Sequence, residues 1–156
     1  MNELTEPQFT LTEHYFWMLC RVEVNICAKT ETIWNLLTDA RNFPQWNSTV
    51  ASIDGEIREG ERLRLHVPGT NRVFTPKVSG VVPYERMTWS GGFLPVFKGV
   101  RKFELNRRSD VSTRFLMQER FSGLMLPLLK RVLPDFRPVF ESYACDLKRA
   151  AERTRE

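Results

Sequence analysis

The chain has 156 residues and a formal net charge of +4; 42% of its residues are hydrophobic and 27% are charged. These values describe a single globular domain and exclude disordered and collagen-like proteins. No apolar run approaches the ~18 residues of a membrane span, and the acidic N-terminus does not resemble a secretory signal. We therefore expect a cytoplasmic protein without stable membrane insertion.

Residues suited to metal or redox chemistry are few. Cys20, Cys27 and Cys145 have no CxxC spacing, and the only histidines are His14 and His66. His66 falls on the polar face of its strand, where we expect it to be solvated. The basic residues are scattered and accompany no nucleic-acid-binding motif. The sequence predicts no metal site, no cofactor, no catalytic residue and no nucleic-acid partner.

Residues 1–14 are interpreted as an N-terminal extension, and the first strand is predicted over 16–26. A short helix is expected over 30–40 with Thr30 as its cap, and 42–47 form a second short helix or loop carrying large aromatic rings. Alternation directs one set of strand side chains inward: Phe16, Met18, Cys20, Val22, Val24 and Ile26.

From about residue 49 to 121 the pattern changes to strands separated by turns, which is typical of an antiparallel meander. Strands are expected at 62–67, 72–82, 86–92, 98–106 and 111–121. A short apolar helix over 123–132 follows. A longer helix is then predicted from about Asp135 to Arg153, with an apolar stripe of Phe136, Val139, Phe140, Tyr143 and Leu147.

This order predicts an α+β fold. A curved antiparallel sheet of about seven strands would surround the long C-terminal helix, with two short helices after the first strand. The segments IWNLLTDARNFPQWN, DGEIREGERLRL, VVPYERMTW, TRFLMQERFSGLM and DLKRAAE resemble the START-like helix-grip superfamily (SRPBCC), in its polyketide cyclase/dehydrase branch. The resemblance spans roughly residues 16–153, so we expect one START-like domain over 15–156. It implies a small hydrophobic molecule held between sheet and helix.

Strand parity and the helical stripe supply the candidate ligand-binding residues. The inward sheet positions can form either a packed core or the wall of a cavity. Trp46 could close over a ligand or could attach the short helices to the sheet. The ligand-binding candidates are Trp46, Leu65, Phe74, Met87, Trp89, Arg101, Phe103, Phe115, Met117, Glu119, Phe136, Phe140 and Tyr143; Leu63 and Val78 are further inward positions.

Arg101 and Glu119 share the parity of their phenylalanine neighbours, and a turn at 107–110 would bring them opposite or diagonal to each other. Two inward charges are expected to pair, either at a wet rim or as the polar anchor of an apolar cavity. Tyr143 could add a hydroxyl.

The leading functional interpretation is a binding or transport module for a lipid, polyketide or aromatic molecule, as a monomer or homodimer. The alternative is an aromatase/cyclase- or dehydratase-like enzyme, in which Arg101 would stabilise enolate charge and Glu119 or Tyr143 would move protons. A protein-partner module is a weaker alternative.

Overall fold

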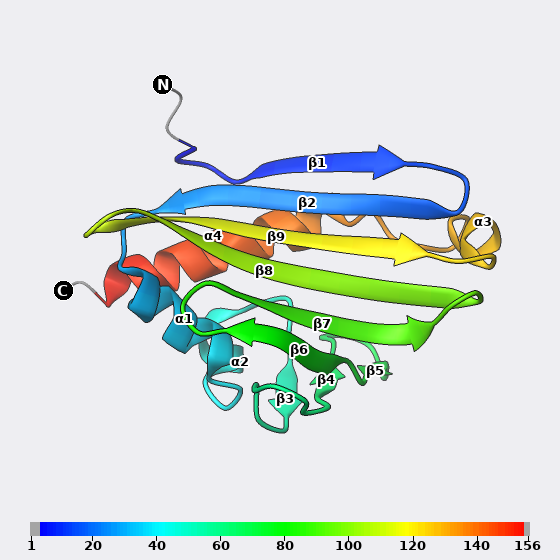
Figure 1. Ribbon diagram of the computed structural model, residues 1–156, viewed down its shortest axis with the longest axis horizontal. Coiled ribbons are helices and arrows are strands. Elements are labelled where there is room, and N and C mark those ends of the chain that lie inside the picture. The colour runs from blue at the N-terminus through cyan, green and yellow to red at the C-terminus, as the bar shows by residue number, and fades with distance from the viewer. Residues whose placement is uncertain (1–3, 155–156) are drawn as a thin grey trace.

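The computed structural model describes residues 4–154. Its main element is a six-stranded antiparallel sheet in the order β1-β2-β9-β8-β7-β6 (Figure 1). The strands are β1 (Gln8–Glu13), β2 (Trp17–Ile26), β6 (Lys77–Val82), β7 (Arg86–Phe93), β8 (Phe97–Ser109) and β9 (Ser112–Ser122). A separate three-stranded sheet contains β3 (Ser52–Asp54), β4 (Arg64–His66) and β5 (Val73–Phe74). The predicted antiparallel meander is confirmed, divided between two sheets.

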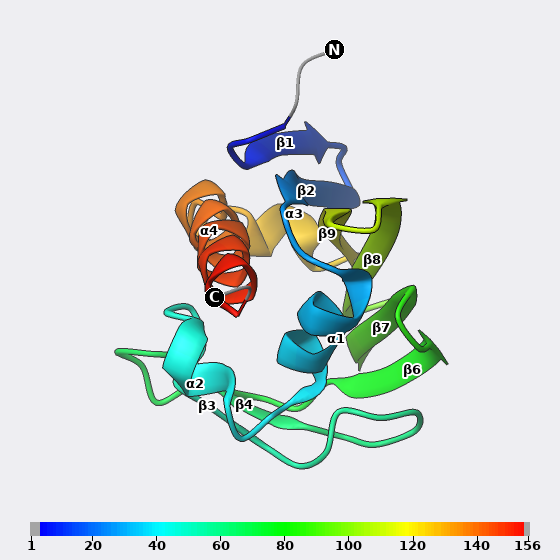
Figure 2. The ribbon, with the colours of Figure 1, turned by 90° about the vertical axis from the view of Figure 1, so that its left-hand side faces the viewer.

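The long helix α4 (Arg137–Arg153) lies along the concave face of the main sheet, as Figure 2 shows. The short helices α1 (Thr30–Thr38) and α2 (Phe43–Trp46) and the small sheet close the lower side of the molecule in that view, and α3 (Leu126–Leu129) follows β9. This is the predicted helix-grip arrangement. None of these helices, within residues 4–154, is long and apolar enough to cross a membrane.

The alternation of β2 directs five side chains into the core, as predicted, because successive strand residues face opposite sides of the sheet. These fully or almost fully buried residues are Met18, Cys20, Val22, Val24 and Ile26. Phe16 was expected among them, but it lies in the turn before β2 and is 47% exposed.

Other local expectations need correction. The predicted N-terminal extension contains β1, which pairs with β2 along its whole length. Thr30 does not cap α1: Lys29 is the N-cap residue, and the Thr30 hydroxyl instead bonds the Thr113 hydroxyl at 3.1 Å. The apolar segment 123–132 forms only one helical turn, α3.

Candidate functional site

The inner face of the main sheet is organised in cross-strand rows, because the antiparallel register places inward residues directly opposite one another. One row contains Cys20, Glu119, Arg101 and Trp89, from β2, β9, β8 and β7. The rows on either side of it are apolar. One contains Met18, Phe121 and Gly99, and the other contains Val22, Met117, Phe103 and Met87. A single polar row is thus inserted in an otherwise apolar wall.

Arg101 and Glu119 form an ion pair within this row. The Nε and Nη2 groups of Arg101 both donate to Oε2 of Glu119, at 3.0 and 2.7 Å. Their side chains keep 19% and 17% exposure, so the pair is neither dry nor at a fully wet rim. The guanidinium also lies 5.4 Å from the ring centre of Phe140 and 6.0 Å from that of Tyr143, both on α4. The pair therefore faces the space between sheet and helix.

Burial and neighbouring charges shift the pKa values of side chains in and beside this row. Burial alone would lower the pKa of Arg101, but the Glu119 carboxylate outweighs it and the pKa is raised. Burial, reinforced by Glu119, raises the pKa of Cys20 to about 12. Burial likewise raises the pKa of Tyr143, with Arg101 opposing it. Near neutral pH the row thus presents a guanidinium and a neutral thiol, with a neutral phenol across from it.

Tyr143 is the centre of an aromatic cluster that joins three elements. Its ring is 5.8 Å from Trp46 and 6.2 Å from Phe43 on α2, and 6.1 Å from Phe103 on the sheet. Trp89 joins the cluster through Phe103, at 4.9 Å. Trp46, for which two roles were left open, packs α2 against α4 through this contact.

Three polar atoms of this cluster have no hydrogen-bond partner among the described residues. They are the indole Nε1 atoms of Trp46 and Trp89 and the hydroxyl of Tyr143, all buried. An unpaired buried donor costs roughly 1–3 kcal/mol, so such groups are uncommon in a core that serves only for stability. Indole N–H groups can only donate, and the phenol can donate or accept. The cluster therefore contains donors whose hydrogen bonds are not made among the described residues.

A polar contact holds α4 to the segment after α2. The buried carboxylate of Asp146 accepts hydrogen bonds from the backbone N–H of Ser48 at 2.8 Å and from its hydroxyl at 2.6 Å. The neighbouring Asn47 is buried and accepts from Thr49. These bonds fix the distance between α2 and α4, and with it the position of Trp46 beside Tyr143.

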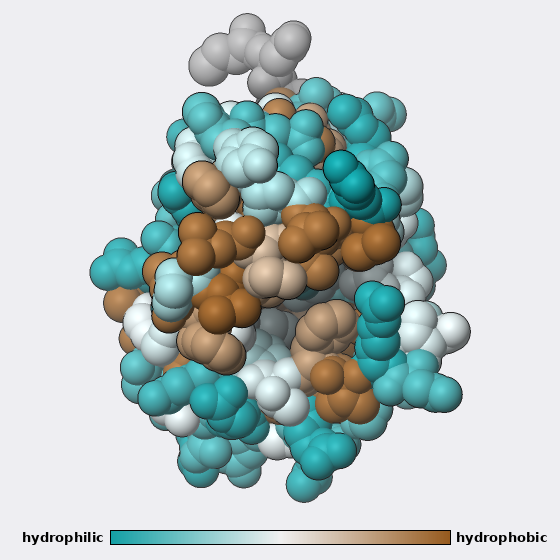
Figure 3. Space-filling view, turned by 90° about the vertical axis from the view of Figure 1, so that its right-hand side faces the viewer, coloured by the Kyte–Doolittle hydropathy of each residue, from teal (hydrophilic) through white to brown (hydrophobic). Residues whose placement is uncertain are grey.

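One end of the molecule is hollowed, and apolar side chains surround the opening (Figure 3). The β1–β2 turn, α3 and the β7–β8 turn lie at this end in Figure 1, with β5 below them. Backbone hydrogen bonds join the segment before α3 to the two turns: Gly123 donates to Phe16, Leu124 to Pro95 and Met125 to Val96. Gly123 has φ +133°, and a side chain there would collide with the Val96 carbonyl. From this opening, stacked rings of Phe97, Phe121 and Phe136 lead inward.

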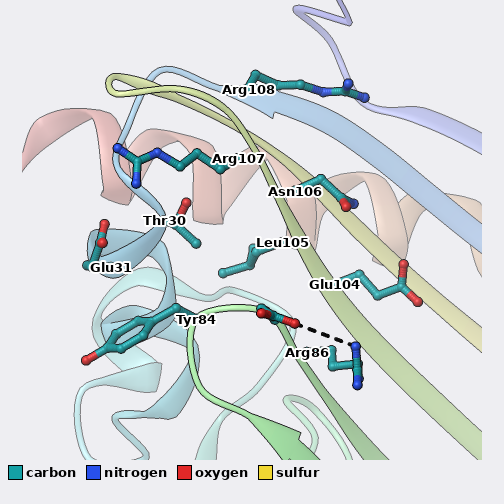
Figure 4. A pocket seen from close by; sticks show the side chains of 10 residues that line it. Thr30, Glu31, Tyr84, Arg86, Glu104, Leu105, Asn106, Arg107 and Arg108 are labelled. Carbon is teal, nitrogen blue, oxygen red and sulfur yellow. Dashed lines mark ion pairs between the residues drawn. The ribbon is translucent and has the colours of Figure 1, made fainter.

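A separate pocket of about 560 Å³ lies at the opposite end, between the start of α1, the β6–β7 turn and the last residues of β8 (Figure 4). It is lined mainly by exposed charged side chains, including Glu31, Arg107, Arg108 and the Glu85–Arg86 ion pair. Thr30, its one buried polar residue, is already hydrogen-bonded. No residue predicted for ligand binding lines this pocket, and most of its lining side chains are charged, so we do not assign it to a hydrophobic ligand.

The structure places most predicted site residues together. Ten of them contribute to the inner wall or to α2 and α4 around it: Trp46, Met87, Trp89, Arg101, Phe103, Phe115, Met117, Glu119, Phe140 and Tyr143. Phe136 is half-buried and also lines a hollow of about 230 Å³ beside β1.

Two predicted positions lie elsewhere. Phe74 is 52% exposed on β5, because the 72–82 segment breaks at Thr75 and Pro76 into two strands of different sheets. Leu65, its partner on β4, is half-buried in the same small sheet. Val139 of the expected helical stripe is 41% exposed, so the buried face of α4 is narrower than predicted.

Sequence reasoning did not select Phe43 or Cys20 as site residues. Phe43 is fully buried and contacts Trp46, Trp89 and Tyr143. Cys20 had the inward parity, but its position beside Glu119 required knowing that the first and last long strands pair. No group of three or more His, Cys, Asp or Glu residues suited to a metal ion occurs within residues 4–154.

Known structures with the same fold include enzymes and a START protein. The Zhui aromatase/cyclase from Streptomyces sp. R1128 superposes with a TM-score of 0.70 at 14% identity, covering 90% of this chain and 96% of that one. A START superfamily protein from Mycobacterium smegmatis gives 0.65 at 20% identity, with coverages of 87% and 98%. Norcoclaurine synthase from Thalictrum flavum superposes with a TM-score of 0.67 at 14% identity, covering 96% of this chain and 100% of that one. At these identities the likeness concerns the fold.

No curated protein matches the sequence. A family model described as "Polyketide cyclase / dehydrase and lipid transport" matches residues 20–154, which includes β2 from Cys20 onward, the polar row and the whole of α4. The sheet, the grip of α4 and this match agree with the resemblance noted in the sequence. The chain belongs to the polyketide cyclase/dehydrase and lipid transport family.

Proposed function

We propose that this protein binds a small hydrophobic or aromatic molecule that carries oxygen acceptors, in the space between the main sheet and α4. The observation that carries the proposal is the set of three buried donors, on Trp46, Trp89 and Tyr143, that have no partner within residues 4–154. Aromatic walls would hold the body of the ligand, while a carbonyl or hydroxyl oxygen would accept from these donors. The Arg101–Glu119 pair would orient a polar end of the ligand.

A matched pair of tricyclic ligands tests this proposal. Fluorene and 9-fluorenone have nearly the same shape, but only fluorenone has an acceptor oxygen. Both would be titrated against a hydrophobic fluorescent probe bound to the native protein. We expect fluorenone to bind about five- to tenfold more tightly, which corresponds to one hydrogen bond of about 1 kcal/mol or slightly more.

Substitution locates the effect. Trp89→Phe and Tyr143→Phe should reduce the preference for fluorenone while leaving fluorene binding nearly unchanged. Native mass spectrometry of freshly purified protein would identify any molecule retained from the cell. Equal affinity for both ligands, or failure of either to displace the probe, would argue against the proposal.

An enzymatic role of the cyclase or dehydratase kind is the second candidate. It is favoured by one observation: a guanidinium, a carboxylate and a phenol converge on one part of the site. Arg101 would stabilise an enolate oxygen, and Glu119 or Tyr143 would transfer the proton. The test is exchange of the α-hydrogens of 2-tetralone in heavy water, followed by NMR. Faster exchange in the presence of the native protein, lost in Arg101→Met, would support enolisation. Binding of 2-tetralone without faster exchange would support a carrier function instead.

A further inference from the structure

The hollowed end carries an unusual concentration of exposed apolar side chains. Six of them, defined here as the apolar rim, are each 47–68% exposed: Phe16, Phe74, Phe93, Leu94, Leu124 and Leu128. They come from the β1–β2 turn, β5, the end of β7 and its turn into β8, the segment before α3, and α3 itself, which lie toward the same end of the molecule in Figure 1. Figure 3 shows hydrophobic side chains around the hollow at that end. An exposed apolar patch gathered at one end of a domain marks an interaction surface.

The stretches of chain that contain and flank these segments carry most of the protein's excess positive charge. Residues 14–17, 68–76, 91–98 and 120–137 include six Lys or Arg and a single acidic residue, Asp135. They therefore carry +5, and since the whole chain carries +4, the rest of it carries −1. The sequence alone made the basic residues look scattered. The fold brings five of these six, Arg72, Lys98, Arg120, Lys130 and Arg131, into or beside the strand ends and turns of the apolar rim, whereas Arg137 lies over Phe9 on β1.

The rim is held in place rather than collapsed into the hollow. Backbone hydrogen bonds of 2.8–3.0 Å join residues 123–125 to the β1–β2 and β7–β8 turns. Lys130 adds a hydrogen bond from its ammonium group to the carbonyl of His14. The apolar side chains at the turn tips therefore project outward together, and fixed projection avoids the ordering cost of a flexible loop.

We infer that the apolar rim docks on an anionic phospholipid bilayer, with the hollow facing the membrane. Rim phenylalanines and leucines would enter the interface between headgroups and acyl chains, while cations around them would contact lipid phosphates. The +5 charge of these segments favours an anionic bilayer over a neutral one. The docking does not depend on the ligand, although it would place the opening of the proposed binding site against a source of hydrophobic molecules.

Vesicle co-sedimentation tests the inference. The full chain would be mixed with vesicles of phosphatidylcholine alone or of phosphatidylcholine with about 30% phosphatidylglycerol. We expect clear binding only to the anionic vesicles, weakened at 0.5 M salt because salt screens the attraction. Each Lys or Arg near such a surface strengthens binding about fivefold, so the double variant Arg72→Gln/Arg131→Gln should bind about 25-fold more weakly.

Matched controls are available away from the rim. Arg41→Gln/Arg108→Gln removes two exposed charges outside the rim segments, and should leave vesicle binding within about twofold of the native value once the long-range contribution is screened. Leu128→Ser and Phe93→Ser should each weaken binding, whereas Val111→Ser, which truncates a 52% exposed valine on the far β8–β9 turn, should not. Urea denaturation confirms that each variant is folded.

Other occupants of the rim would produce different results. Failure to bind anionic vesicles, or equal binding to both compositions that does not respond to the rim variants, overturns the inference. Concentration-dependent dimerisation abolished by Leu128→Ser would assign the rim to a second copy of this chain. Vesicle binding by Tyr143→Phe separates docking from the proposed function. That variant should lose the preference for fluorenone over fluorene but should still bind anionic vesicles.

Discussion

Arg101 and Glu119 are direct cross-strand partners on the inner face of the sheet, joined by two hydrogen bonds to one carboxylate oxygen. Both side chains are about four-fifths buried, and apolar rows flank them on either side. A charge in such a position is stable only while its partner is present. The same two residues therefore contribute to the stability of the fold and to the proposed binding of a ligand.

Removing one member of this pair should be costly. We expect Glu119→Gln or Arg101→Met alone to lower the free energy of unfolding by about 3 kcal/mol, because each leaves a mostly buried group without its charge partner. The double variant should recover most of that loss. Urea denaturation of all four proteins measures the coupling. The exposed Glu85–Arg86 pair is the control, with an expected effect below about 1 kcal/mol. Single substitutions that barely change the free energy of unfolding would contradict the claim that each buried charge depends on its partner.

The Tyr143 hydroxyl should contribute to binding without contributing to stability. Its ring is 1% exposed and its oxygen has no partner within the described chain, so Tyr143→Phe removes an unsatisfied polar group and keeps the packing. We expect stability to be unchanged or raised by up to about 1 kcal/mol, and fluorenone affinity to fall about five- to tenfold. Thermal unfolding and probe displacement measure the two effects. A clear loss of stability would show that the hydroxyl is already satisfied in the free protein.

The Asp146–Ser48 contact should stabilise the fold by holding α2 against α4. Asp146→Ala leaves the Ser48 N–H without its acceptor and should cost about 2 kcal/mol, whereas Ser48→Ala removes only the hydroxyl bond and should cost about 1 kcal/mol. Asp110→Ala, at a side chain 89% exposed, is the matched control with an expected cost below about 0.5 kcal/mol. Equal small effects at all three positions would mean that the contact does not hold the helices.

Glu23 should make stability depend on pH in the acidic range. Burial acts to raise its pKa, but hydrogen bonds from Arg114 and Arg21 outweigh burial, and the pKa is lowered. A lowered folded-state pKa gives stability that is present above the unfolded-state value and is lost as the pH falls through the folded-state value. Glu23→Gln should therefore cost about 1 kcal/mol near neutral pH, and the difference should shrink below about pH 4. Urea midpoints across pH 3–7 (about the range where the carboxylate titrates) test this. A difference that does not change with pH would rule out this origin.

Strand parity was sufficient to predict much of the site. The alternation of residues 98–106 and 111–121, with a turn between them, predicted that Arg101 and Glu119 face inward and lie across from each other, and both expectations are confirmed. Helical spacing likewise predicted Phe140 and Tyr143 on the buried side of α4. Local periodicity is informative here because each side chain's direction follows from its own strand or helix.

Where a neighbouring element decides the outcome, the sequence was insufficient. β1 was not predicted, because Phe9 and Leu11 give it only a weak apolar face and it forms by hydrogen bonding to β2. Phe74 is a large apolar residue of the kind expected on the inner wall, yet the break at Pro76 places it in the small sheet at the apolar rim.

Local sequence patterns were enough to predict the family resemblance, the antiparallel sheet with its C-terminal helix, and the inward charge pair. Packing of distant segments brought Cys20 beside Glu119, left the donors of Trp46, Trp89 and Tyr143 without partners among residues 4–154, and placed cations from three separate segments near one opening. The reason is physical: periodicity encodes the direction of a side chain relative to its own backbone, whereas partners and surface patches depend on the packing of segments distant in sequence.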